Sequence, residues 1–232
     1  MELEARVAAI VQETPSVKSF VLELDREFTF LPGQYVDLSI YTPEGTVVAG
    51  YSITSTPLQK RVITIAVKRI PDARAATSLH ERAQVGDTFT IMGPGGGFYY
   101  QREMGDSLVL IAGGIGITPL MSMVRYVHEA RLPVDATLLY SAQCPSELAF
   151  LEELRAISAQ STNIRCFFTV TRPQGEYWEG RVGRIDREML REHTLRRESL
   201  FYICGPGEMP RQMSELLRGL GVDSSRIKTE RW

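Results

Sequence analysis

The sequence has few cysteines and histidines, which limits the disulfide and metal chemistry that it can carry. Its three cysteines, Cys144, Cys166 and Cys204, are odd in number and widely separated. They match neither a disulfide framework nor a zinc or iron–sulfur ligand cluster. The three histidines are equally scattered. We therefore expect no protein-bound metal.

Long apolar runs and a strong charge of one sign are also lacking. The longest apolar runs, such as 108–111 and 136–139, are far shorter than the roughly 20 residues of a membrane span. The first four residues lack the basic and apolar regions of a signal peptide. A net charge of −2 would attract neither nucleic acid nor an anionic membrane. We expect a cytoplasmic protein with no nucleic-acid partner and no membrane span.

The composition is that of an ordinary globular protein large enough for two domains. Hydrophobic residues make up 44% and charged residues 23% of the 232 residues, close to the average for folded proteins. A chain of this length can form two domains of about 100 residues, each with its own core.

The first part of the chain has the pattern of an all-β domain. Short alternating segments at 17–24, 35–41, 47–54, 62–68 and 88–92 are separated by turn residues such as Pro32-Gly33 and Gly86-Asp87. One short helix is expected at about 76–83. Evenly spaced short strands predict a closed barrel or a sandwich.

After Gly105, apolar strands alternate with helices. Strands are expected at 108–112, 136–141, 164–170 and 200–204, and helices at 119–130, 146–159 and 209–220. This alternation predicts a parallel sheet with helices on both faces. The polar stretch 101–106 separates the two patterns, so we predict domains at 1–102 and 103–232.

A glycine-rich turn follows the first strand of the second domain. Gly113, Gly114 and Gly116 are followed by Thr118, expected as a helix N-cap, and by Pro119, expected at the first helical position. Such a turn directs free N–H groups and the positive end of the helix dipole toward a ligand, which suits a pyrophosphate. The spacing is not G-x-G-x-x-G, so a turn without a ligand remains the alternative.

Two further segments lie where predicted strands end. Cys204-Gly205-Pro206 precedes a helix that begins near Met209, and in an open α/β sheet this turn and the glycine turn could face one ligand. The segment from Tyr51 to Thr54 offers an aromatic ring and hydroxyl groups that suit a planar tricyclic ring. The alternatives are that Cys204 is simply a small buried residue and that the segment from Tyr51 to Thr54 only packs within the barrel.

In order along the chain, these segments resemble the ferredoxin–NADP reductase family over nearly the whole sequence. The matching segments are 31–36, Tyr51-Ser52, Val67-Lys68-Arg69, 77–80, 85–87, 93–98, 113–119 and 204–209. The resemblance implies an N-terminal antiparallel Greek-key β-barrel that binds FAD and a C-terminal doubly wound α/β domain that binds NAD(P). The lack of cluster-forming cysteines identifies a two-domain form without an iron–sulfur domain.

The resemblance also implies roles for individual residues. Tyr51 would pack against the flavin ring, Ser52 would bond near its N5 edge, and Cys204 would lie where hydride passes, so these three are the predicted catalytic residues. Thr77 and Ser78 would hold the flavin phosphate. The predicted cofactor-binding residues are Tyr51, Ser52, Ile53, Thr54, Val67, Lys68, Thr77, Ser78, Gly113, Gly114, Gly116, Thr118, Pro119, Ser141, Gln143, Arg172, Cys204, Gly205, Pro206, Met209 and Trp232.

Several positions bear on how cofactors are expected to bind. Ala49 stands where the family usually has an arginine on the flavin phosphate, and Ala75 where it usually has glycine. We therefore expect FAD, with FMN or a loosely bound, diffusible flavin as alternatives. Gln143 stands where an arginine often binds the 2′-phosphate of NADPH, so we expect NADH rather than NADPH, although Arg172 could serve a phosphate. Trp232 would stack on the flavin or be a frayed terminus.

The predicted function is an NAD(P)H reductase that passes electrons from flavin to a separate acceptor, such as a ferredoxin-like or oxygenase component. The alternatives are an NAD(P)H:flavin reductase that releases reduced flavin and a non-catalytic nucleotide-binding module of a larger complex. The stretch 181–197 contains six arginines, which fits either a docking face for an acidic redox partner or a solvated helix surface.

Overall fold

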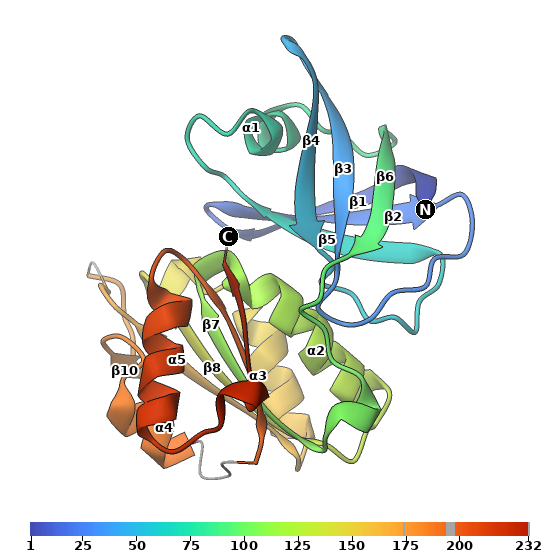
Figure 1. Cartoon of the computed structure of the whole chain (residues 1–232). Coiled ribbons are helices and arrows are strands. Elements are labelled where there is room, and N and C mark those ends of the chain that lie inside the picture. The colour runs from blue at the N-terminus through green and yellow to red at the C-terminus, as the bar shows by residue number, and fades with distance from the viewer. Residues whose placement is uncertain (174, 194–197, 232) are drawn as a thin grey trace.

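A computed structural model describes residues 1–173, 175–193 and 198–231 and has a β domain followed by an α/β domain (Figure 1). The β domain contains β1 (Glu2–Thr14), β2 (Val17–Leu24), β3 (Tyr35–Thr42), β4 (Gly45–Ser52), β5 (Val62–Lys68), the helix α1 (Arg74–Glu81) and β6 (Thr88–Gly95). All neighbouring strands are antiparallel, in the order β4-β3-β6-β1-β2-β5.

The sheet of the β domain curls until its two edges meet. An isolated bridge joins Ile53, directly after β4, to Ile65 on β5, and β4 and β5 are the edge strands. Alternation explains which side chains fill the barrel: in β1, Leu3, Ala5 and Val7 are buried while their neighbours face outward. The predicted antiparallel barrel is therefore confirmed.

The α/β domain holds the strands β7 (Ser107–Gly113), β8 (Asp135–Ala142), β9 (Ile164–Val170), β10 (Arg181–Val182), β11 (Leu200–Gly205) and β12 (Ile227–Arg231). Its helices are α2 (Ile117–Glu129), α3 (Leu151–Gln160), α4 (Arg187–His193) and α5 (Met209–Gly219). The strands are parallel in the order β10-β9-β8-β7-β11-β12, so the winding reverses between β7 and β11. The predicted doubly wound sheet is confirmed.

Two apolar layers enclose the parallel sheet. Leu108 and Leu110 of β7 pack with α2 and α3 on one face, whereas Val109 and Ile111 pack with α4 and α5 on the other. Burial on both faces explains why β7 has a continuous apolar sequence. Within the described residues, no helix is long and apolar enough to cross a membrane.

Three local predictions were wrong. Gly116, not Thr118, precedes α2, and the Thr118 hydroxyl instead donates to the Ile115 carbonyl at 3.0 Å. Pro119 is the third residue of α2, because a 3₁₀ turn over 114–116 runs directly into the helix. The helix expected from residue 146 begins at Leu151, since Phe150 before it has a left-handed backbone with a φ of 61°.

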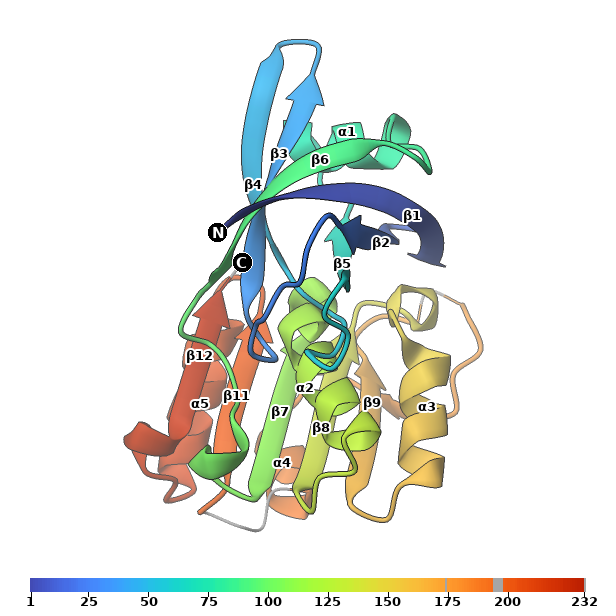
Figure 2. The ribbon, with the colours of Figure 1, turned by 90° about the vertical axis from the view of Figure 1, so that its right-hand side faces the viewer.

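The two sheets are joined by residues 96–106, which include the 3₁₀ turn Arg102–Met104. The predicted division between residues 102 and 103 lies in this connection and stays a prediction. Figure 2 shows the β domain above the α/β domain, with α2 at their junction.

Candidate active site

A cleft of about 440 Å³ lies between the two domains, at the carboxyl ends of β7, β11 and β12. We call it the interdomain cleft. Its position beside the reversal in strand order is where ligands bind in open α/β sheets. The β domain contributes Tyr35, Ala49, Gly50, Tyr51, Ser52, Ala66, Lys68, Ile70, Ala73, Ala75 and Ala76, and the α/β domain contributes Ile115, Thr118, Cys204, Glu230 and Arg231.

Aromatic and hydroxyl groups form the β-domain wall. Burial raises the pKa of Tyr51 to about 12, so its phenol stays neutral at physiological pH. Tyr35 lies against a glycine turn, where a Cβ added to Gly95 would come within 2.8 Å of the Tyr35 ring. The Ser52 hydroxyl makes no hydrogen bond to another described residue, which leaves it free for a ligand. This wall suits one face and one polar edge of a planar ring.

The α/β wall is built from two turns that pack directly on each other. A Cβ on Gly116 would lie 2.3 Å from the Cys204 carbonyl oxygen, and one on Gly113 would lie 2.3 Å from the sulfur of Met209. The structure therefore brings the glycine turn and the 204–209 turn together. Close packing is one reason for glycine at these two positions, separate from any approach of a ligand.

Cys204 lies at the base of the interdomain cleft and is 2% exposed. Burial raises the pKa of its thiol, so the sulfur is protonated at neutral pH. Because the thiolate is the reactive form of cysteine, this side chain is suited to packing and not to nucleophilic attack.

Sequence reasoning missed Glu230, the one carboxyl group that lines the interdomain cleft among the described residues. Glu230 pairs with Cys204 in the parallel register of β11 and β12. Burial raises the pKa of its carboxyl to about 7. No strand was predicted here, because the short run Ile227–Arg231 carries too many charged residues to look like a strand.

A second cleft of about 530 Å³ continues along the carboxyl edge of the parallel sheet. We call it the sheet-edge cleft. Of the predicted residues, Gly113, Gly114, Ser141, Gln143, Arg172, Pro206 and Met209 line it, together with Lys68. Lys68 also lines the interdomain cleft, so the two clefts share a wall.

Backbone hydrogen bonds assemble the loops around the sheet-edge cleft. The Arg172 N–H donates to the Gln143 carbonyl at 2.7 Å, which holds the loops after β8 and β9 together. Arg184, which sequence reasoning did not select, also lines this cleft. Two arginines and Lys68 provide positive charge suited to the phosphates of a dinucleotide.

Other predicted residues lie outside the interdomain cleft. Thr77 and Ser78 line a separate hollow of about 400 Å³ on the far side of α1, where the Ser78 hydroxyl donates to the Tyr41 carbonyl at 3.2 Å. The side chains of Ile53, Thr54 and Val67 are buried in the barrel, and Pro119 is buried in α2. Trp232 lies outside the described residues.

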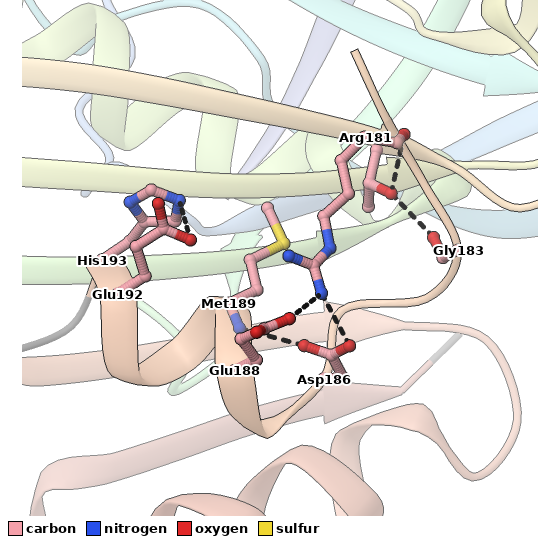
Figure 3. A network of polar contacts seen from close by, with 8 residues as sticks. Arg181, Gly183, Asp186, Glu188, Met189, Glu192 and His193 are labelled. Atoms are coloured by element: carbon pink, nitrogen blue, oxygen red, sulfur yellow. Dashed lines mark hydrogen bonds and ion pairs between the residues drawn. The ribbon is translucent and has the colours of Figure 1, made fainter.

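One residue of the arginine-rich stretch, Arg181, is engaged in local structure. Figure 3 shows the Arg181 guanidinium between Asp186 and Glu188, at 2.7 and 3.2 Å. The Asp186 carboxylate also accepts the Met189 N–H at 2.9 Å, which fixes the start of α4. Arg181 thus stabilises the fold between β10 and α4, and Arg196 and Arg197 lie outside the described residues.

The interdomain cleft fits a flavin ring better than it fits a flavin phosphate. Tyr51 and Ser52 offer a ring wall and a hydrogen-bonding group, but Ala73, directly before α1, and Ala75 and Ala76 within it present only methyl groups. The helix starts without a side-chain cap, so its first N–H groups are free to donate to a phosphate oxygen. Among the described residues, the His, Cys, Asp and Glu side chains form no group of three or more that could hold a metal ion.

Comparison with known proteins agrees with this arrangement. The family model of the oxidoreductase FAD-binding domain matches residues 4–100, and that of the oxidoreductase NAD-binding domain matches residues 110–215. A glycine betaine monooxygenase reductase subunit of Chromohalobacter salexigens is 33% identical, over 97% of this chain and 62% of that relative. The chain thus spans about three fifths of that relative's length. The human oxidoreductase NAD-binding domain-containing protein 1 is 35% identical, over 98% of this chain and 79% of its own.

Solved structures show the same two-domain arrangement. The flavohem-like FAD/NAD-binding domain of nitric oxide dioxygenase from Vibrio cholerae has a TM-score of 0.89 at 26% identity, over 99% of this chain and 98% of that one. A ferredoxin NADP⁺ reductase from Neisseria gonorrhoeae, solved with FAD and NADP, has a TM-score of 0.83 at 25% identity, over 99% of this chain and 98% of that one. On the two family models, these relatives and the geometry of its clefts, the chain belongs to the ferredoxin reductase-like family.

Proposed function

We propose that this chain is a flavin-dependent NAD(P)H reductase that passes electrons to a separate acceptor. The observation that carries the proposal is the interdomain cleft, which places Tyr51 and Ser52 of the β domain opposite Thr118 and Cys204 of the α/β domain. The adjoining sheet-edge cleft, with its two arginines, is suited to a dinucleotide. Family membership supports both cofactors.

Bound flavin would supply the redox chemistry, since its ring takes two electrons from a nicotinamide and releases them singly. The protein's residues bind and orient the reactants. Tyr51, as a neutral phenol, would cover the ring, and the Ser52 hydroxyl would bond to its polar edge. Glu230 can hold or release a proton near neutral pH because of its raised pKa.

For the electron donor we propose NADH over NADPH. Gln143, directly after β8, lines the sheet-edge cleft with an uncharged side chain, so this loop offers no positive charge to a 2′-phosphate. Arg172 and Arg184 then serve the diphosphate that both nucleotides share. A cytoplasmic location fits this donor.

For the electron acceptor we propose a separate ferredoxin-like or oxygenase component. The relative from Chromohalobacter is named as the reductase subunit of a glycine betaine monooxygenase, which supports an oxygenase component as the acceptor.

A second candidate function is favoured by the alanine-lined wall of the interdomain cleft. Ala49, Ala73, Ala75 and Ala76 give the phosphate end of a flavin no side-chain hydrogen bond. A charge-assisted hydrogen bond contributes about 1.5 to 3 kcal/mol, or roughly ten- to a hundredfold in affinity. A flavin held without one would exchange with solvent, and the protein would then reduce diffusible flavin.

The visible spectrum of the purified protein, recorded before and after anaerobic addition of NADH, tests these functions. Flavin absorbance that copurifies and bleaches supports the reductase with a bound flavin. A colourless protein that reduces added flavin catalytically supports the second function. If neither NADH nor NADPH reduces any flavin, both are wrong and a non-catalytic nucleotide-binding module takes their place.

A further inference from the structure

Two side chains of α2 reach across to the main chain of the β domain. The Ser122 hydroxyl, which is fully buried, donates to the Ser55 carbonyl at 2.6 Å. One turn further along, the Arg125 guanidinium donates through Nη1 to the Thr54 carbonyl at 2.9 Å. Residues three apart lie on one face of a helix, so the two bonds act on the same segment.

Arg125 is itself held firmly on its other side. Its Nε and Nη2 each donate to one carboxylate oxygen of Glu153 at 2.7 Å, and its guanidinium lies 5.2 Å from the centre of the Phe150 ring. The side chain of Arg125 is only 16% exposed. A bidentate arginine of this kind is fixed in orientation, unlike an ordinary surface ion pair.

The segment that receives these bonds is equally fixed within the barrel. The Thr54 N–H donates to the Thr64 carbonyl at 2.7 Å, and the Thr64 N–H donates to the Ser55 hydroxyl at 3.0 Å. Thr64 belongs to β5, which also carries Lys68. The residues directly after Ser52 are therefore held by β5 on one side and by α2 on the other.

We propose that Arg125, assisted by Ser122, is a positioning residue that sets the distance between the two halves of the interdomain cleft. Thr118, at the start of α2, lies two helical turns before Arg125, and Ser52 lies two residues before Thr54. The bond from Arg125 to Thr54 thus fixes the end of α2 that lines the interdomain cleft relative to the end of β4 that lines its opposite wall. This inference rests on the proposed function.

The expected effect is on the rate of hydride transfer rather than on binding. Arg125 touches neither cleft, so losing its bond leaves the lining residues in place but loosens their alignment across the domain junction. A misplacement of about 1 Å between reacting groups can reduce a rate about a hundredfold. A purely stabilising role would lower the melting temperature and leave the reaction rate of the folded protein unchanged.

Stopped-flow reduction of the flavin-loaded protein by NADH tests the proposal. We expect Arg125→Met to lower the limiting rate of flavin reduction about ten- to a hundredfold. The NADH concentration that gives half of this rate, and the affinity for flavin, should each change less than about threefold. Reduction of the same protein by dithionite, which needs no alignment of domains, should keep its wild-type rate.

Glu153→Gln is the matched control, because it removes the ion pair of Arg125 but leaves its hydrogen bond to Thr54. We expect this variant to lose stability but to lose much less of the limiting rate than Arg125→Met does, because the amide oxygen still accepts from the guanidinium and the bond to Thr54 remains. Ser122→Ala, which deletes one hydroxyl, is a milder variant to use if Arg125→Met does not fold, and its limiting rate should fall severalfold.

Two results would overturn the proposal. One is a folded Arg125→Met protein, or Ser122→Ala in its place, that reduces flavin at the wild-type rate. The other is an equal loss of rate in Glu153→Gln. A wild-type protein that neither nucleotide reduces would instead contradict the proposed function, so the two failures are distinguishable.

Discussion

The alanine-lined wall of the interdomain cleft predicts that one substitution will increase flavin affinity. Ala49 lies on β4 with its side chain toward the cleft, two residues before Tyr51. Ala49→Arg would place a guanidinium where the phosphate end of a bound flavin meets α1. We expect FAD and FMN to bind about ten- to a hundredfold more tightly, since a charge-assisted hydrogen bond contributes about 1.5 to 3 kcal/mol.

Titration by flavin fluorescence quenching measures this gain, and riboflavin separates phosphate recognition from ring packing. Riboflavin has no phosphate, so its affinity should stay unchanged, and the gain for FMN should decrease as ionic strength rises. Val48→Arg is the matched control, because successive residues of a strand face opposite sides and the side chain of Val48 is exposed. Equal gains in the two variants, or a gain for riboflavin, would refute the reasoning.

Three further predictions concern other residues of the clefts. Because the pKa of Glu230 is raised from 4.5 to about 7 in the folded protein, its ionisation reduces stability as pH rises through that window. Thermal melting should therefore show Glu230→Gln gaining stability relative to wild type as pH rises from about 5 to about 8. A difference in melting temperature that does not change with pH would contradict this pKa. Gln143→Arg should lower the KM for NADPH about tenfold and leave the KM for NADH unchanged, as steady-state assays can show. Since the buried Cys204 thiol is protonated, iodoacetamide at neutral pH should leave reductase activity intact, and rapid inactivation prevented by Cys204→Ala would show the opposite.

The strands and helices with a strong local pattern were predicted well from the sequence. The apolar strand Ser107–Gly113 is buried on both faces, and its position follows from hydrophobicity alone. By contrast, β1 escaped notice because its pairing with β2 shifts register between Val7 and Ala9 and again between Gln12 and Thr14. Each shift interrupts the alternation by which a strand is recognised.

The site was predictable in outline but not in its details. The turns at Gly113 and Cys204 were expected to face one ligand, and the structure brings them together because parallel strands end at a common edge. Which side of α1 faces the interdomain cleft depends on how the helix packs on the barrel, so sequence could not show that Thr77 and Ser78 line a separate hollow. Glu230 required knowledge of the β11–β12 register, which no local pattern encodes.

The contacts of α2 with the β domain also bear on how such a protein can change over evolutionary time. Both acceptors, at Thr54 and Ser55, are main-chain carbonyl oxygens that every amino acid possesses. Substitutions at these two positions can therefore accumulate without removing either acceptor. Selection on the interdomain bonds themselves would act on the donors, Ser122 and Arg125, whereas Thr54 and Ser55 are constrained by their burial and by their hydroxyl bonds to Thr64 within the barrel.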